Sequence, residues 1–259
     1  MSSRTKYLVA IAAAGLVVAA AGIWFVFFRD TAPDAVNLDD AVGSVTSTTT
    51  APASGSTTTV PADDAPDDDA PSEAAPLDGT WIIDTTAGGG TVEEGSFVGY
   101  RVQEELASIG AKTAVGRTTA LSGSFTFEGS ALSAASVVAD LTQLKSDSGG
   151  RDGQMRTQSL ETNTFPEATF TLTSPVELGA APADGESFSV QAEGDLTIHG
   201  VTQSVIVPIA GQVVGETVVV VGLIQIVFED YQIDKPESFR VLSVEDIGEM
   251  EFQLFLTRS

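Results

Sequence analysis

The chain has no cysteine and only one histidine, His199, among its 259 residues. The lack of cysteine excludes disulfides, cysteine nucleophiles and cysteine-ligated metal sites, so a folded domain must depend on its hydrophobic core. A Ser–His–Asp triad would have to use His199, and a metal site would have to be built from carboxylates. His199 ends the run DLTIHG beside a glycine turn. The simpler interpretation is a surface histidine that hydrogen-bonds a hairpin loop.

Carboxylates that could serve acid–base chemistry are present, but those that are close in sequence are not placed to act on the same substrate. They occur as sequence neighbours at Glu93-Glu94, Glu104-Glu105 and Glu229-Asp230. Adjacent residues of a strand point to opposite faces, so such neighbours cannot converge on one substrate. The three glycines at 88–90 precede TVEEG rather than a helix, which excludes a phosphate-binding loop. We therefore predict that the protein is not an enzyme and has no catalytic residue, no metal site and no cofactor.

Basic residues are scarce. The chain has 12 Lys and Arg against 36 Asp and Glu, which gives a formal net charge of −24. Ten of the acidic residues and no basic residue fall between Asp30 and Pro76. A chain of this charge repels the phosphates of nucleic acids and anionic lipid surfaces. Nucleic acid is therefore excluded as a partner.

The chain has one long apolar run, Leu8–Phe28, without a charged residue. As a helix it would be about 31 Å long, which is close to the thickness of a bilayer core. Basic residues precede the run and acidic residues follow it, so the positive-inside rule places residues 1–7 in the cytoplasm and the rest of the chain outside. The sequence predicts a single-pass, cell-membrane protein with an uncleaved signal anchor. A cleaved signal peptide is the rival interpretation, because Ala12–Ala14 and Ala19–Ala21 resemble cleavage sites.

Residues 29–76 are rich in Thr, Pro and Asp and have almost no large apolar side chains. Such a segment cannot bury enough surface to offset its conformational entropy, so we expect a disordered linker. A flexible coil of this length spans about 40 Å and would let a tethered domain stand off the membrane.

Residues 77–259 form a domain of ordinary size in which short strand-like runs alternate with turn signals. In Ser187–His199, apolar side chains alternate with polar ones, as in an antiparallel sheet with one packed and one solvated face. Thr217–Phe228 is apolar on both faces, so a helix, another segment or a partner must cover its outer side. The pattern predicts an all-β fold, an antiparallel sheet of about eight strands closed into a barrel or folded as a sandwich.

This domain resembles the YceI-like family of bacterial lipid-binding proteins. The resemblance rests on five segments in the same order: GTWIID (79–84), GSFTF (123–127), RDGQMR (151–156), FPEATF (165–170) and GDLTIHGVT (194–202). It implies a lipocalin-like barrel whose lumen holds a long apolar ligand of the isoprenoid, quinone or fatty amide type, and it implies no catalytic residue. One departure is the segment TTAGGGTVEEGSF after Asp84, where relatives commonly have a histidine. It places in question any ligand contact near the first hairpin.

The break in the strand pattern, Arg151–Leu172, is the expected site of ligand entry. We expect a short helical crossover that lies across the barrel opening and points Met155, Leu160 and Phe165 inward. Arg151 and Arg156 are candidates for contact with a polar head group at the rim, where Asp152 would pair with them. The full set of candidate ligand-binding residues is Phe97, Tyr100, Phe125, Phe127, Met155, Leu160, Phe165, Phe170 and Phe188. An ordinary surface crossover and a filled core remain the alternatives.

Two functions follow from these observations. The first is a membrane-tethered, extracytoplasmic protein that carries or sequesters a long-chain isoprenoid-type lipid in a barrel lumen. The alternative is a non-catalytic structural or interaction module, displayed on a stalk, with a filled core and an exposed apolar patch near Thr217–Phe228.

Overall fold

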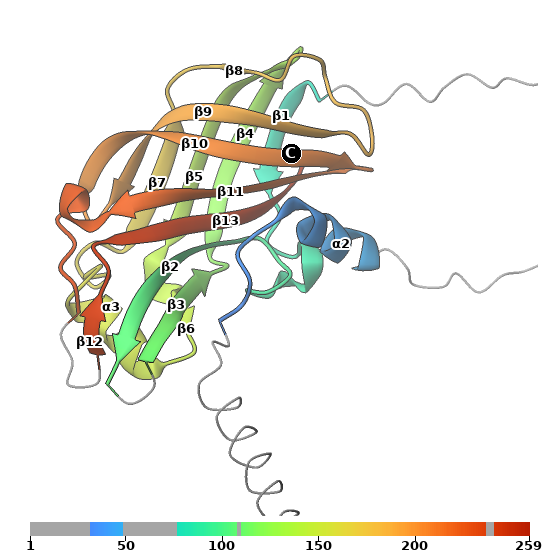
Figure 1. Ribbon diagram of the computed structural model, residues 1–259. Helices are drawn as coiled ribbons and strands as arrows, with labels where there is room; N and C mark the ends of the chain where they lie inside the picture. Colours follow the sequence, from blue (N-terminus) through green and yellow to red (C-terminus); the bar gives the residue numbers. More distant parts are fainter. Residues whose placement is uncertain (1–31, 49–76, 108–109, 237–240) are drawn as a thin grey trace, which may run out of the picture.

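The structure is a computed structural model that describes residues 32–48, 77–107, 110–236 and 241–259 (Figure 1). The predicted membrane helix, residues 8–28, and the residues before it lie outside this part of the chain. Within the described part, no helix combines the length and the apolar character that a membrane crossing requires. The membrane anchor and the location outside the cytoplasm therefore stay predictions.

The described residues form one antiparallel sheet and two α-helices. The strands are β1 (Gly79–Ile83), β2 (Phe97–Leu106), β3 (Gly110–Thr118), β4 (Leu121–Glu128), β5 (Ala131–Asp140), β6 (Lys145–Ser146), β7 (Glu167–Leu172), β8 (Val176–Glu177), β9 (Ser187–Ile198), β10 (Val201–Val214), β11 (Thr217–Val227), β12 (Val241–Val244) and β13 (Ile247–Arg258). The α-helices are α2 (Leu38–Thr48) and α3 (Gly149–Thr157), and the short 3-10 helices are η1 (Ala87–Gly90), η2 (Leu141–Gln143) and η3 (Phe228–Tyr231).

Eight strands close into a barrel, as the sequence predicted. Their order is β1-β4-β5-β7-β9-β10-β11-β13, and β13 pairs with β1 to complete the ring. The long strand β13 shares one edge between two partners, because Leu256–Arg258 pair with β1 and Glu249–Gln253 pair with β2. Strands β2, β3 and β6 therefore continue the sheet beyond the ring, on the side where α3 lies (Figure 1).

Alternating side chains position the barrel core. In β9, Ala192, Gly194, Leu196 and Ile198 are buried inside, and Glu193, Asp195 and Thr197 between them face outward. The turn from β9 to β10 consists of His199 and Gly200, which both have positive φ values, 53° and 73°. Two-residue hairpin turns need this left-handed backbone, which glycine adopts without steric cost. The packed and solvated faces of this hairpin are those that the sequence predicted.

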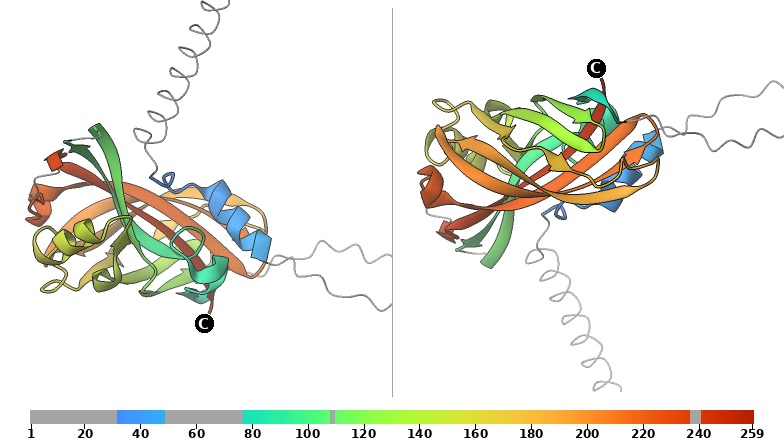
Figure 2. Two further views of the ribbon diagram at one scale, coloured as in Figure 1. Left: turned by 90° about the horizontal axis from the view of Figure 1, so that it is seen from below. Right: turned by 90° about the horizontal axis from the view of Figure 1, so that it is seen from above.

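The expected disorder of residues 29–76 is wrong for residues 38–48, which form helix α2 on the outside of the barrel (Figure 2). Asn37 caps the helix by accepting a hydrogen bond from the backbone N–H of Asp40 at 2.9 Å. Small and branched apolar residues recur at helical spacing on one face: Leu38, Ala41, Val42 and Val45. This face packs on Val219, Val221 and Phe255 of the barrel wall, so α2 covers the outer side of β11.

Residues 32–48, here called the strap, are also held by a buried charge cluster. Glu251, which is fully buried, is paired with Arg117 at 2.7 Å and with Arg101 at 3.6 Å. It also accepts a hydrogen bond from the backbone N–H of Val36 at 3.3 Å. Arg101 donates to the carbonyl oxygen of Pro33 at 2.8 Å, and Arg117 donates to that of Asp34 at 3.2 Å. The strap is therefore fixed to the barrel by both polar and apolar contacts.

Candidate functional site

The barrel interior contains two adjoining cavities of about 110 and 60 Å³. Val98, Ala168 and Met250 line both of them, so the two cavities share a wall, and they are here together called the hollow. By the same volume measure, a cavity that holds a single water molecule needs about 10–15 Å³. The walls are mainly aliphatic and aromatic, which suits an apolar ligand rather than water.

Strand β2 supplies one wall of the larger cavity because its side chains alternate. Val98, Tyr100, Val102 and Glu104 line that cavity. Gly99 and Arg101, which alternate with them, also border the cavity, but the guanidinium of Arg101 pairs with Glu251 on the outer wall. Strands β11 and β13 add Ile226 and Met250, while η3 and the chain after it add Phe228 and Ile233.

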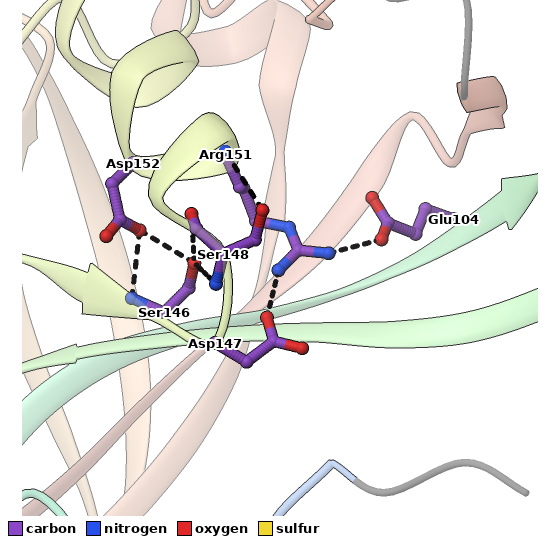
Figure 3. Close-up of polar contacts among 6 residues, drawn as sticks. All are labelled: Glu104, Ser146, Asp147, Ser148, Arg151 and Asp152. Atoms are coloured by element: carbon purple, nitrogen blue, oxygen red, sulfur yellow. Dashed lines mark hydrogen bonds and ion pairs between the residues drawn. The ribbon is translucent and has the colours of Figure 1, made fainter.

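The crossover after β6 covers the end of the larger cavity. Ser148 is the N-cap of helix α3, and its Oγ accepts a hydrogen bond from the backbone N–H of Arg151. Asp152 accepts from the backbone N–H of Ser146 at 2.9 Å and from its hydroxyl at 2.7 Å, which ties the helix to β6 (Figure 3). Met155 and Leu160 line the cavity from this segment. Residues 149–160, here called the lid segment, therefore border the larger cavity, whereas Phe165, the third residue expected to point inward, does not.

An ion-paired arginine lies where the lid segment meets β2. Arg151 reaches the carboxylates of Glu104 and Asp147 (Figure 3). Burial alone would lower the pKa of Arg151, but the charge and hydrogen bond of Glu104, with the charge of Asp147, raise it overall. The guanidinium thus stays charged and already has two anionic partners.

The ion pairs at the rim of the barrel have other partners than those expected. Arg151 pairs with Glu104 and Asp147 rather than with Asp152, which bonds Ser146. Arg156 is exposed and does not line either cavity.

Six of the predicted ligand-contact and rim residues line the hollow. Tyr100, Arg151, Met155 and Leu160 line the larger cavity, and Phe125 and Phe170 line the smaller one. Four other aromatic candidates line neither cavity: Phe97, Phe127, Phe165 and Phe188.

Each of these four aromatic residues has a different position. Phe97 faces the outer wall, where the guanidinium of Arg117 lies 4.1 Å from its ring centroid. Phe127 is part of the filled core. Phe188 packs on the same core over Gly211, and Phe165 packs edge-on against His199 with ring centroids 4.5 Å apart.

His199 is more buried than a surface histidine, with a side chain that is 10% exposed. Its Nε2 lies 2.8 Å from the carboxylate of Glu161, and its Nδ1 lies 3.2 Å from the carbonyl oxygen of Tyr231. The expectation was a hydrogen bond to a hairpin loop. The two partners, Glu161 and Tyr231, lie outside the β9–β10 turn, so His199 joins three separate segments. Its contacts hold the chain after the lid segment to the β9–β10 turn and to η3.

Sequence reasoning missed the aliphatic part of the lining. The missed residues are Val98, Val102, Ala114, Ile198, Ile226, Ile233, Val244 and Met250. Alternation within β2 and β11 would have placed Val98, Val102 and Ile226 on the inner face. It could not have shown which inner residues border empty space and which are packed.

The segment after Asp84 does not reach the hollow. Residues 85–96 fold back on the outer wall, where the carbonyls of Val92 and Gly95 accept hydrogen bonds from Arg117 and Gln253 at 3.1 and 2.9 Å. None of these residues lines either cavity. The segment that departs from the family pattern therefore does not border the hollow. In the described part of the chain, no group of three or more His, Asp or Glu is placed to hold a metal ion.

Comparisons with known proteins agree with this geometry. The family model described as YceI-like domain matches residues 91–256, more than half of the chain. A polyisoprenoid-binding domain from Saccharophagus degradans, implicated in plant cell wall breakdown, has a similar fold, with a TM-score of 0.54 and 23% identity over 69% of this chain and 98% of that one.

Two further solved structures match less closely. BcnA from Burkholderia cenocepacia is 22% identical, with a TM-score of 0.48, over 62% of this chain and 95% of that one. A Campylobacter jejuni YceI protein is 14% identical, with a TM-score of 0.47, over 56% and 84%. No curated protein matches the chain in a sequence comparison. The family match over the barrel, together with the closed eight-strand ring, shows that this chain belongs to the YceI-like family.

Proposed function

We propose that this protein carries or sequesters a long-chain isoprenoid-type lipid inside its barrel. The observation that carries the proposal is the apolar hollow, which is lined by the lid segment in its larger cavity and by Ala168 in both cavities. A lipid chain placed there would gain about 0.8 kcal/mol for each CH₂ group removed from water. The similar fold of a polyisoprenoid-binding domain supports this class of ligand.

The interaction-module alternative receives less support from the same observations. It expects a filled core, whereas the interior is partly hollow. It also expects an exposed apolar patch near Thr217–Phe228, whereas α2 covers Val219 and Val221, which are 0% and 4% exposed. A binding protein without catalytic groups fits the family better than an enzyme does.

We also propose that residues 8–28 anchor the chain in the membrane, with the barrel outside the cytoplasm. The strap changes the geometry that the linker suggested. Only four residue steps separate Phe28 from Ala32, and a fully extended chain covers at most about 14 Å over that length. The barrel wall would then be held near the bilayer rather than at the end of a stalk of about 40 Å.

Extraction of bound lipid from the purified full chain tests the carrier proposal. We expect organic extraction and mass spectrometry to recover a prenyl lipid, or the purified protein to take one up. The variant Ala168→Phe should retain much less, because Ala168 lines both cavities and is 8% exposed. Thr171→Phe is the matched control, since it adds the same ring on the exposed side of the same strand.

Both variants must first show the circular dichroism spectrum of the parent protein. A parent protein that is isolated free of lipid and binds no prenyl lipid would rule out the carrier function. Equal lipid retention in both folded variants would show that the hollow is not the binding site. Fractionation of the full chain against a chain that begins at Ala32 tests the anchor, and membrane association of both forms would contradict it.

A further inference from the structure

Two hydroxyl groups in the larger cavity are buried without a partner. The Tyr100 hydroxyl and the Ser159 Oγ have no hydrogen-bond partner among the described residues. Both residues line the cavity, and Ser159 is only 3% exposed. Most buried hydroxyls in proteins are hydrogen-bonded, because an unpaired one costs about 1–3 kcal/mol. Two such unpaired groups in a mainly apolar cavity indicate the position of a polar atom of the ligand.

The ring of Tyr100 is held in place by the neighbouring strand. A Cβ atom built on Gly116 would lie 2.4 Å from Cε1 of Tyr100 and 2.9 Å from its hydroxyl oxygen. Any other residue at 116 would displace the ring. Gly116 on β3 therefore makes room for the phenol. Ser159 lines the same cavity from the lid segment.

The Tyr100 hydroxyl remains a hydrogen-bond donor at physiological pH. Burial raises its pKa, and the charge of Arg151 opposes this only in part. The carboxylates of Asp152, Glu104 and Asp147 raise the pKa further. A protonated phenol can donate to an acceptor oxygen of a ligand.

The charges around these hydroxyls disfavour an anionic ligand. Arg151 lines the same cavity, but Glu104 and Asp147 already bind its guanidinium. These three side chains together carry a net charge of −1. A phosphate placed beside them would find no uncompensated positive charge, because Glu104, which is 6% exposed, already neutralises Arg151 and Asp147 adds a second, exposed carboxylate.

We propose that Tyr100 and Ser159 form a head-group subsite for an uncharged oxygen, a carbonyl or a hydroxyl, and that the site discriminates against phosphorylated isoprenoids. This inference rests on the proposed lipid-carrier function and assigns the chemistry of the ligand's polar end. Tyr100 donates to the ligand oxygen, and Ser159 donates to the same oxygen or accepts from a ligand hydroxyl. The tail occupies the apolar hollow beyond them.

Binding of ligands with one tail and different heads to the full chain tests the subsite. The probes are geranylgeraniol, the corresponding methyl ketone, geranylgeranyl phosphate and an isoprenoid hydrocarbon of equal length. We expect both uncharged oxygen ligands to bind at least about tenfold more tightly than the phosphate. Tyr100→Phe should weaken them by roughly three- to tenfold, the effect of one lost hydrogen bond, and leave the hydrocarbon unaffected.

Tyr231→Phe is the matched control. Tyr231 is also buried, its hydroxyl also lacks a partner among the described residues, and it does not line either cavity. Its substitution should leave all four affinities unchanged. Ser159→Ala should reproduce part of the Tyr100→Phe effect.

The possible results separate the subsite from the carrier function. If the hydrocarbon binds and the phosphate binds as tightly as the alcohol, the subsite is overturned and the carrier function stands. The same conclusion follows if Tyr100→Phe weakens the hydrocarbon as much as the ketone, or weakens none of the ligands. Failure of all four probes to bind would overturn the carrier function as well.

Discussion

Substitution of Glu251 by Gln tests how the strap and the barrel wall are held together. The change keeps the size of the side chain and removes its charge. Arg117 then loses its closest anion at a site where its own side chain is 7% exposed. Loss of one partner of a buried ion pair costs about 3–5 kcal/mol, because the other charge stays buried without compensation.

The structure places the expected cost at the lower end of this range. The Gln amide oxygen can still accept from Arg117, which also donates to the carbonyls of Val92 and Asp34. We therefore expect Glu251→Gln to lower the free energy of unfolding by about 3 kcal/mol. For a domain of this size that corresponds to a fall in Tm of about 6–12 °C.

Urea unfolding followed by tryptophan fluorescence provides the measurement, because Trp81 is 3% exposed in the folded barrel. The control is Lys235→Gln, which breaks an ion pair whose side chains are 45% and 82% exposed and should cost less than about 1 kcal/mol. The double variant Arg117→Met/Glu251→Leu removes both charges of the closest pair and leaves Arg101, which is 12% exposed, with its hydrogen bond to the Pro33 carbonyl, so it should recover at least half of the loss. The reasoning is refuted if Glu251→Gln costs no more than the control, or if the double variant is as unstable as the sum of its single changes.

Three further predictions concern the strap, the lid segment and the first loop. Ala41→Asp places a charge on the fully buried face of α2 and should speed hydrogen exchange of the helix amides, whereas Gly43→Asp, where an added Cβ meets no atom within 4 Å, should not. Met155→Ala should weaken lipid retention by at least about fourfold, the equivalent of one lost methylene contact; Phe165→Ala, outside the hollow, should lower Tm instead. Asp84→Asn should remove a pH-dependent part of the stability, as measured by urea unfolding at several pH values.

The sign of the Asp84 effect follows from its contacts. Burial raises the pKa of Asp84, but hydrogen bonds from the Thr86 hydroxyl and the N–H groups of Thr86 and Ala87 lower it overall from 3.8. Its contribution is therefore present above pH 3.8 and is lost as the pH falls through the lower, folded-state pKa. A stability difference that grows with acidification would contradict this assignment. Unchanged exchange in Ala41→Asp, or equal lipid loss in Met155→Ala and Phe165→Ala, would contradict the other two.

The lining of the hollow was only partly predictable. Tyr100, Met155 and Leu160 were placed correctly because each is a large side chain on β2 or in the break between strands. Phe97 was misplaced because aromatic character was given more weight than alternation, and its neighbour Val98 takes the inner position. Side-chain alternation tells which face a residue occupies, but cavity shape depends on residues from many strands.

The strap shows a second limit. Its apolar spacing, Leu38, Ala41, Val42 and Val45, is visible in the sequence, but it lies inside a long acidic and Thr-rich segment. A helix of 11 residues is only marginally stable alone in water. Its stability depends on the barrel wall, which is more than 170 residues away in the chain.

The choice of a barrel over a sandwich came from the family resemblance, whereas the sequence by itself determined the antiparallel strands, the two faces of the β9–β10 hairpin and the break in the strand pattern at the crossover. These features follow from local patterns, since alternation and turn residues act over a few neighbours. Only the tertiary structure decided where the interior stays hollow, that His199 joins three segments, and that residues 32–48 cover β11. Each of these depends on contacts between residues far apart in the chain, which no local pattern records.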